Sequence, residues 1–359
     1  MSNEPLNLST TTVSFLCTYF LLGALLGLTG NGVVLYSSVR YQAISLDKAC
    51  FVLVQHLAAA DLIYTVFATL PVLVAYLARK WVLGPTWCFI NAHLPFIPGV
   101  ANILLVLIIT SHRLYVITFP FRGVFQSTKV RVWTVFIWIV SIGLFAIATF
   151  YFKSSASFNP DTGWCFSSVY VWKDAQLFML IASVIFVVLP IMITTVANVC
   201  LSCIAFKISS VMGKTLTIPR SPTSIVFSKT SDMVSPDLNL VEKQHTRRRR
   251  RKYKGLIMTC LLSGVFVFSW LFYIVYLVAK VAIPGDYMTL YLLSTCFIMI
   301  NTFVNPILYT LTNRRFGAYV KGVLLRLLKK GPDKVKHPPI KCGSVRNVFQ
   351  NRNASNSNV

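Results

Sequence analysis

The 359-residue chain is 55% hydrophobic and only 12% charged, whereas about a quarter of the residues are charged in a typical soluble protein. Its formal net charge of +24 would suit a nucleic-acid-binding protein, but the basic residues flank long apolar runs. Such a pattern is typical of a membrane protein, so nucleic acid is set aside as a partner.

Seven segments reach the roughly 20 apolar residues that a helix needs to cross a bilayer. Prolines and glycines within them do not argue against helices, because neighbouring spans can satisfy the backbone carbonyls that they free. We therefore predict an all-α membrane protein in which residues 13–312 form a bundle of seven transmembrane helices. The predicted spans run from Val13 to Val39, Ala49 to Ala78, Cys88 to Ser111, Val132 to Phe152, Ala175 to Phe206, Gly255 to Ala279 and Tyr287 to Thr312.

The distribution of basic residues predicts the orientation of this bundle. Residues 1–12 contain no lysine or arginine, and we expect them to be extracellular. In this orientation 29 of the 34 basic residues lie on the cytoplasmic side, together with the C-terminus. We thus expect a multi-pass protein of the plasma membrane. The five basic residues left outside are Arg79, Lys80, Lys153, Lys173 and Lys280.

Two cysteines and one asparagine fall on the expected outer side. Cys88 begins the third span, and Cys165 lies in the loop after the fourth. Because the extracellular compartment is oxidising, we expect a disulfide between them. Asn7 begins an Asn-Leu-Ser glycosylation sequon, a short motif that also occurs often by chance. The sequence thus predicts an outer loop tied to the third span and a glycosylation site at Asn7.

Two cytoplasmic regions are expected outside the bundle. Residues 207–254 are rich in Ser, Thr and Pro and lack apolar periodicity, so we expect them to be disordered. They end in the basic run from Arg247 to Lys252, which favours contact with anionic lipid. Residues 313–330 read as an amphipathic helix on the membrane surface, and residues 331–359 as a disordered tail. The apolar face of that helix holds Phe316, Tyr319, Val320, Val323 and Leu324.

The chain carries no recognisable motif of an enzyme. It lacks a G-x-x-x-x-G-K phosphate loop, a set of histidines and cysteines with metal-ligand spacing, and a nucleophile elbow. We therefore expect no catalytic residues and no enzymatic activity.

Asp61 is the only acidic residue inside a predicted span. A charge at the centre of a membrane helix costs roughly 3 kcal/mol, so its carboxylate must face polar partners in the bundle interior. The spacing suits two interpretations equally: a hydrogen-bonded network that joins the helices, or a site for a sodium ion or a proton. The polar residues available to it are Asn31, Asn102, Asn301, Thr302 and Asn305.

Two further patterns stand in the last two spans. Pro306 is expected to kink the seventh span, with Asn305 capping the freed backbone groups and Tyr309 one turn further on. Phe266 and Trp270, four residues apart, share one face of the sixth span. This aromatic pair is compatible with simple core packing as well as with a functional role.

Taken in order, these residues resemble those of rhodopsin-like G-protein-coupled receptors. The resemblance covers all seven spans and the membrane-surface helix. It rests on the order and spacing of the whole set, since each member alone is weak. Its carriers are Gly30, Asn31, Leu57, Asp61, Trp81, Gly84, Cys88, Arg113, Tyr115, Trp138, Cys165, Pro190, Phe266, Trp270 and the run from Asn305 to Tyr309.

The resemblance implies a receptor that converts binding of an extracellular ligand into activation of a heterotrimeric G protein, with arrestin and a receptor kinase as further partners. Arg113 corresponds to the arginine that contacts the G protein, and Tyr309 to the tyrosine that supports it. The residues around Asp61 match a sodium pocket, which favours the cation interpretation. The implied coupling and switch residues are Arg113, Tyr115, Pro190, Phe266, Trp270, Asn305, Pro306 and Tyr309.

The chain departs from the family pattern near the cytoplasmic side. Ser111 and Lys252 stand where the family places acids near the arginine, which predicts a raised basal activity through a shift of about 1 kcal/mol. Asn198 replaces a tyrosine of the fifth span that assists the active state. Phe272 replaces the proline that kinks the sixth span, which predicts a straighter sixth helix.

The resemblance argues against two classes of ligand. Monoamine receptors carry an aspartate where Pro95 stands, and opsins carry the retinal-binding lysine where Met299 stands, so we expect neither a monoamine nor retinal. The pocket is apolar and aromatic with few polar groups, and a lipid-like, indole-like or small peptide ligand fits it equally well. The expected pocket residues are His93, Phe96, Gly99, Tyr273, Thr295 and Met299, beside Trp270.

Two alternative functions are considered besides that of a ligand-activated receptor. A receptor without a ligand would signal constitutively or through pairing with another receptor. An ion-coupled transporter would use Asp61 as its coupling residue, but it needs paired halves or broken helices, which an odd number of spans suits poorly. G-protein activation measured with and without ligands would separate these readings.

Overall fold

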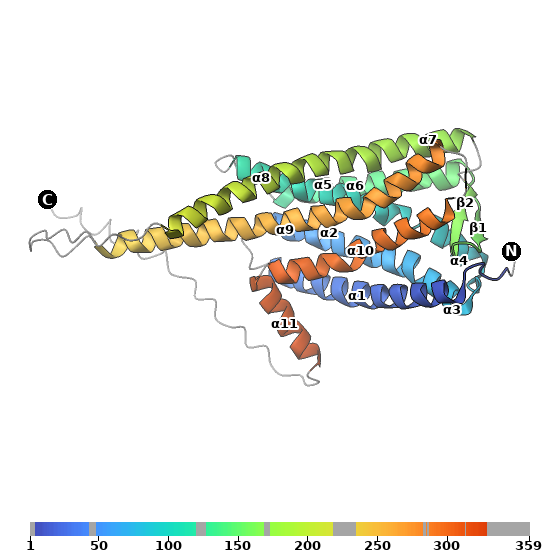
Figure 1. The fold of residues 1–359 in the computed structure, drawn as a ribbon, viewed down its shortest axis with the longest axis horizontal. Helices are drawn as coiled ribbons and strands as arrows, with labels where there is room; N and C mark the ends of the chain where they lie inside the picture. The colour runs from blue at the N-terminus through green and yellow to red at the C-terminus, as the bar shows by residue number, and fades with distance from the viewer. Residues whose placement is uncertain are drawn as a thin grey trace, which may run out of the picture. The chain divides into compact units, whose positions relative to one another are not determined.

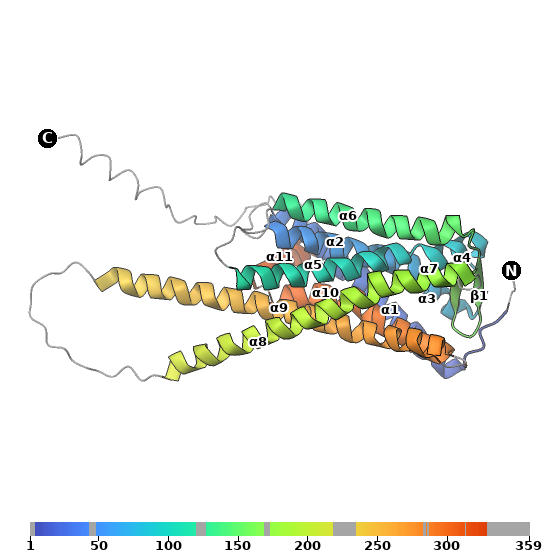
Figure 2. The same ribbon diagram turned by 90° about the horizontal axis from the view of Figure 1, so that it is seen from above.

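The structure is a computed structural model, and it describes residues 4–42, 48–119, 127–168, 173–217, 235–282, 285, 287–312 and 314–328. Within these residues seven helical segments are long and apolar enough to cross a membrane, one in each predicted span. They run side by side in Figures 1 and 2, which confirms the predicted bundle. The segments cover Thr10–Val39, Phe51–Ala78, Gly84–Thr118, Thr128–Tyr151, Asp174–Ile208, Leu256–Lys280 and Met288–Leu311.

Most spans are built from more than one helical element. The α-helices are α1 (Thr10–Gln42), α2 (Lys48–Tyr64), α3 (Leu70–Ala78), α4 (Gly84–His93), α5 (Phe96–Thr118), α6 (Ser127–Ala146), α7 (Lys173–Ser183), α8 (Leu189–Thr217), α9 (Ser235–Ala282), α10 (Met288–Thr312) and α11 (Arg314–Leu328). The π-helical segments are η1 (Thr65–Thr69), η2 (Ile147–Tyr151) and η4 (Val184–Val188), and the strands are β1 (Ala156–Asn159) and β2 (Trp164–Ser167).

The π-helical segments lie in the second, fourth and fifth spans. In them the backbone hydrogen bonds reach one residue further than in an α-helix. Pro71 follows η1 and Pro190 follows η4, and neither proline has the N–H group that an α-helix would use. The extra residue in each turn rotates the side chains that follow, so a face read from a regular helical period shifts after each segment.

One end of the bundle carries the β1–β2 hairpin and the start of the chain (Figure 1). The two strands pair antiparallel. The Leu6 N–H donates to the Arg79 carbonyl (2.8 Å), and the Asn7 N–H donates to the Pro160 carbonyl (3.0 Å). The start of the chain is therefore fixed between the end of α3 and the hairpin. We call this the hairpin end of the bundle.

The segment 207–254, expected to be disordered, is helical where it is described. α8 continues to Thr217 and α9 begins at Ser235, so the prediction is wrong for these parts. The run before the sixth span is rich in Glu, Gln, Lys and Arg, which favour helix, and the helix of the span extends through it. Residues 218–234, the side chains of Arg247–Lys252 and the tail from residue 331 lie outside the described residues.

The main core gathers apolar side chains from α1, α2, α5, α6, α8, α9 and α10. Phe316 and Val320 of α11 are buried in it, and the Phe316 ring centroid lies 5.5 Å from that of Phe51 in α2. The chain forms two compact units, Met1–Val323 and Leu324–Val359, and only the first five residues of the second are described.

Candidate functional site

A polar centre forms where α2, α5 and α10 meet. The side chain of Asp61 is fully buried, at 0% exposed. Its Oδ1 accepts a hydrogen bond from Asn102 Nδ2 (2.9 Å), and its Oδ2 accepts one from Asn305 Nδ2 (2.9 Å). Both carboxylate oxygens are thus bonded, as burial of a polar group demands. These bonds tie three spans together through one side chain.

Pro306 frees a backbone carbonyl in α10, and Asn31 of α1 binds it. Because Pro306 has no N–H group, the Thr302 carbonyl one turn earlier lacks its helical donor. Asn31 Nδ2 donates to that carbonyl, while the Thr302 hydroxyl donates within its own helix (2.8 Å). The prediction that Asn305 caps the freed group is therefore wrong, because the Asn305 amide donates to Asp61 instead.

Several buried amide atoms near this centre have no hydrogen-bond partner among the described residues. They are Asn31 Oδ1, Asn102 Oδ1 and Asn301 Nδ2. The amide of Asn102 also donates to Asp61, so its unbonded oxygen lies close to the carboxylate. A carboxylate together with neutral oxygens is a ligand set that hard cations accept. The residues present therefore fit a small monovalent cation as well as a purely hydrogen-bonded network.

Aromatic side chains of α9 pack beside the core and against α10. Phe266 and Trp270 are both buried, with ring centroids 6.0 Å apart. The Trp270 ring also meets Tyr273 edge-on at 5.5 Å. At Phe272, where the resemblance predicted a straighter sixth helix, α9 continues without a break. The Phe272 ring stacks on Phe297 of α10, with centroids 3.7 Å apart and planes inclined by 1°, so that the stack joins the sixth and seventh spans.

The residues that resemble G-protein contacts lie in the last turns of α5 and α10, at the end opposite the hairpin (Figure 2). Arg113 and Tyr115 are half-buried there, and Tyr309 is buried at 2% exposed. Ser111 is exposed. Pro190 is buried at the start of α8, directly after η4. The polar centre around Asp61 thus lies between the hairpin and the last turns of α5 and α10.

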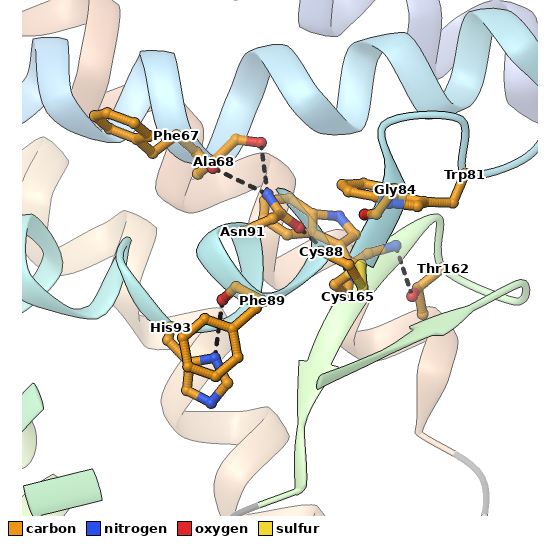
Figure 3. The surroundings of a disulfide bond; sticks show 11 residues. Phe67, Ala68, Trp81, Gly84, Cys88, Phe89, Asn91, His93, Thr162 and Cys165 are labelled. Carbon is orange, nitrogen blue, oxygen red and sulfur yellow. Dashed lines mark hydrogen bonds between the residues drawn. A yellow bond between two sulfur atoms is a disulfide. The ribbon is translucent and has the colours of Figure 1, made fainter. Parts of the chain in front are cut away.

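The expected disulfide joins the hairpin to α4. Cys88 and Cys165 are bonded, and both are buried (Figure 3). Asn91, one turn after Cys88, makes a second connection that sequence reasoning missed. Its Oδ1 accepts a hydrogen bond from the Cys165 N–H (3.3 Å). Its Nδ2 donates to the carbonyls of Phe67 (3.1 Å) and Ala68 (3.2 Å) in η1, so Asn91 joins the hairpin to the second span.

Asn91 and Asn31 both donate to backbone carbonyls that precede a proline in another span. Asn91 donates to the Phe67 and Ala68 carbonyls before Pro71, and Asn31 donates to the Thr302 carbonyl before Pro306. In both cases the available signal was an asparagine in one apolar span and a proline in another. The sequence shows both halves of such a pair, but it does not show which helices are neighbours.

Two of the residues that were expected to line one pocket lie together in a described cavity. His93 and Phe96 line a cavity together with residues of α6, η2, β2 and α7. Gly99 faces open space, since nothing lies within 4 Å of a side-chain carbon placed there. Thr295 and Met299 are buried on α10, where Met299 packs against α1. The described cavity therefore holds only part of the expected set and adds residues of the fourth and fifth spans.

The sequon asparagine lies at the surface of the hairpin end. Asn7 is exposed, and its Nδ2 donates to Asp161 Oδ1 (2.8 Å) in the hairpin turn. The nearby Arg79 guanidinium donates to Thr10 Oγ1 and to the Leu8 carbonyl, both at 3.1 Å. The start of the chain is thus bonded to α3 and the hairpin through side chains as well as through its backbone.

Comparisons with known proteins agree on one family. The chain matches the family described as 7 transmembrane receptor (rhodopsin family) over residues 30–309. The thyrotropin-releasing hormone receptor of Gallus gallus is 24% identical over 309 residues, which are 82% of this chain and 74% of that one. The rhodopsin of Procambarus clarkii is 34% identical over 139 residues, which are 38% of this chain and 36% of that one. Squid rhodopsin shares the fold, with a TM-score of 0.67 at 15% identity over 91% of this chain and 92% of that one.

Proposed function

Because the chain belongs to the rhodopsin family of seven-transmembrane receptors, we propose that its polar centre couples a ligand site at the hairpin end to a G-protein site at the opposite end. It is a G-protein-coupled receptor. The observation that supports this coupling route is the pair of hydrogen bonds that Asp61 accepts from Asn102 and Asn305. A movement of the second, third or seventh span must rearrange these buried hydrogen bonds. A ligand that favours one arrangement therefore shifts the equilibrium between conformations, which differ at both ends of the bundle.

The hairpin end is proposed to face the outside at the plasma membrane. The Cys88–Cys165 disulfide belongs in an oxidising compartment. In this orientation 29 of the 34 basic residues lie on the cytoplasmic side, as the positive-inside rule requires. The exposed Asn7 is then accessible for glycosylation.

At the opposite end we assign Arg113 the contact with the G protein and Tyr309 its support. Arrestin and a receptor kinase are proposed to recognise the same face after activation. The basic segments near the sixth and seventh spans are proposed to contact anionic lipid, because clustered lysines and arginines beside a span are attracted to the charged inner leaflet.

The first test measures ligand-free nucleotide exchange on a G protein by the purified receptor. Arg113→Ala should lower exchange about tenfold, the effect of losing roughly 1.4 kcal/mol of contact free energy. Arg131→Ala, which removes an exposed arginine of α6, is the matched control and should leave exchange unchanged. Equal exchange by the parent and Arg113→Ala would contradict the assignment of Arg113.

A third variant in the same assay addresses basal activity. Ser111→Asp adds a carboxylate at an exposed position two residues before Arg113. An added ion pair of about 1 kcal/mol that favours the resting state would lower basal exchange several-fold. An unchanged basal rate would mean that the residue at position 111 does not set the resting equilibrium. A parent with high basal exchange that no ligand raises would favour a receptor that signals without a ligand.

A sodium ion is proposed as a ligand of the polar centre, held by the Asp61 carboxylate and Asn102 Oδ1. When bound, it supplies a positive charge beside Asp61. Replacing sodium with N-methylglucamine should raise basal exchange by the parent several-fold, because the cation favours the resting arrangement. Asp61→Asn should abolish this dependence, and sodium binding is measured directly by sodium NMR. The same sodium dependence in both proteins would argue for a network without a cation.

A further inference from the structure

Asn91 of α4 is buried, at 3% exposed, and it connects two parts of the molecule that are far apart in the sequence (Figure 3). Its amide oxygen accepts a hydrogen bond from the Cys165 N–H in β2, and its amide nitrogen donates to the Phe67 and Ala68 carbonyls in η1. Turning this amide over would exchange its oxygen and nitrogen and leave buried polar groups unpaired, which costs free energy. The position of the hairpin and that of the η1 backbone are therefore linked through one planar group.

η1 is a segment of the second span that can rearrange locally. Its backbone bonds reach one residue further than those of an α-helix, as the Leu70 N–H donates to the Thr65 carbonyl. A change to α-helical spacing would move the extra residue out of this turn, and one residue corresponds to a rotation of about 100° about the helix axis. Two such arrangements are discrete, which is the property that coupling between distant sites requires of an element.

The other end of η1 is attached to the polar centre. Thr65 is its first residue and is 0% exposed, and the Thr65 hydroxyl donates to the Asp61 carbonyl one turn earlier (2.7 Å). α2, which carries Asp61, continues into η1 without a break. A rotation within η1 therefore turns α2 relative to the rest of the span. It changes how the Asp61 carboxylate meets the amides of Asn102 and Asn305.

A second hydrogen bond joins the hairpin to the second span at a different place. The Tyr76 hydroxyl donates to the Thr162 carbonyl in the hairpin turn (2.8 Å), and Tyr76 is 0% exposed. Tyr76 belongs to α3, which lies on the hairpin side of η1. This hydrogen bond can follow a movement of the hairpin without a change in η1, so it provides a control for the role of Asn91.

We propose that Asn91 is a positioning residue through which movements of the hairpin reach the polar centre around Asp61. When the hairpin moves away from α4, the Cys165 N–H leaves the Asn91 oxygen and the amide is free to turn. The η1 carbonyls of Phe67 and Ala68 then lose their donor, and the population with a different arrangement of Asp61 rises. The inference rests on the proposed receptor function, and it assigns the route by which a molecule bound beneath the hairpin acts on the polar centre.

The test releases the hairpin and measures the response around Asp61. Dithiothreitol reduces the Cys88–Cys165 disulfide. Hydrogen–deuterium exchange of the full chain in phosphatidylcholine nanodiscs is then measured by mass spectrometry, with no G protein present. The readout is the ratio of the exchange rates, reduced over oxidised, in peptides that cover residues 58–69. Asn91→Leu and Asn91→Ala both remove the amide, and Tyr76→Phe is the matched control, since it removes only the hydrogen bond to Thr162.

In the parent and in Tyr76→Phe, reduction should raise the exchange rate of residues 58–69 about fivefold, the effect of losing one hydrogen bond. In both Asn91 variants this ratio should fall to about one, although reduction still raises exchange in β1 and β2. A purely structural role of Asn91 predicts faster exchange in both forms with the same ratio as the parent, and that result would overturn the proposal. It is also overturned if reduction leaves these peptides unchanged in the parent, or if Tyr76→Phe abolishes the ratio. Nucleotide exchange is not measured, so these outcomes are independent of the Arg113→Ala test.

Discussion

The two sides of the bundle are packed differently. On the side of α1 and α10, a side-chain carbon added at Gly30 would lie 3.0 Å from the Pro306 ring, and one added at Gly23 would lie 2.0 Å from the end of Met299. On the side of α5, α6 and α7 there is a cavity, and Gly99 has nothing within 4 Å of such an atom. One side has helices in close contact, and the other encloses a small cavity.

This difference follows from how helices associate in lipid. Apolar helices gain little from burial there, so close packing at small residues and hydrogen bonds between helices hold them together. The α1–α10 contact has both, since Gly30 meets Pro306 and the neighbouring Asn31 binds the Thr302 carbonyl. We therefore expect the side of α1 and α10 to contribute more to stability than the side of α5, α6 and α7.

Two buried methionines test this contrast with the same substitution. Met299 is 1% exposed, and the end of its side chain packs against Gly23. Met299→Ala should therefore leave a void and lower the unfolding free energy by about 3 kcal/mol. Met179 already lines the cavity, and Met179→Ala should cost about 1 kcal/mol, because fewer packing contacts are lost. Unfolding of both variants in the same detergent measures the difference.

The contrast between the sides would be broken if the two methionine variants lost the same free energy. A larger loss for Met179→Ala would mean that the cavity is closed by rearrangement in the folded protein. A small loss for both would mean that α1 contributes little to the stability of the bundle.

The fold was predictable from sequence because recognising a span requires only length and apolarity. Each of the seven spans stands out as a long apolar run with few charged residues, whatever its neighbours are. The contact of Asp61 with Asn102 and Asn305 was predictable for a related reason, because an acidic side chain in a membrane span must face polar partners in the bundle interior. The Cys88–Cys165 pair was predictable from the side of the membrane on which both residues fall.

The remaining features depend on register and on which helices are neighbours. The π-helical segment η2 places Thr149 in the cavity wall, and no periodic pattern reports an extra residue in a turn. His56 accepts a hydrogen bond from Trp138 Nε1 (3.1 Å), but the sequence cannot show that the second and fourth spans touch there. The neighbours of the expected pocket residues were missed for the same reason, since His93 lines a cavity with residues of α6, η2 and α7, and Met299 packs against Gly23 of α1.

Two glycines of α1 sharpen the contrast within a single helix. Gly30→Ala would place a methyl group against the rigid Pro306 ring, and this overpacking should lower the unfolding free energy by about 2 kcal/mol. The higher helix propensity of alanine should offset up to about 1 kcal/mol of that loss. Gly32 has nothing within 4 Å of an added carbon, so Gly32→Ala should show only the gain. Opposite shifts of the melting temperature are the expected result. Shifts of the same sign would show that contact with Pro306 does not limit the approach of α1 to α10.

The smallest effect is expected on the side of α5, α6 and α7, at Gly99. Gly99→Ala adds a methyl group where nothing lies within 4 Å, so only the loss of glycine's backbone entropy should be felt. We expect a gain of up to about 1 kcal/mol in unfolding free energy, as for Gly32→Ala, with unchanged basal nucleotide exchange. The measurement is the melting temperature of both variants in the same detergent. A destabilised Gly99→Ala beside a stabilised Gly32→Ala would mean that the space next to Gly99 closes in the folded receptor, and the contrast between the two sides would then hold only for the cavity around Thr149.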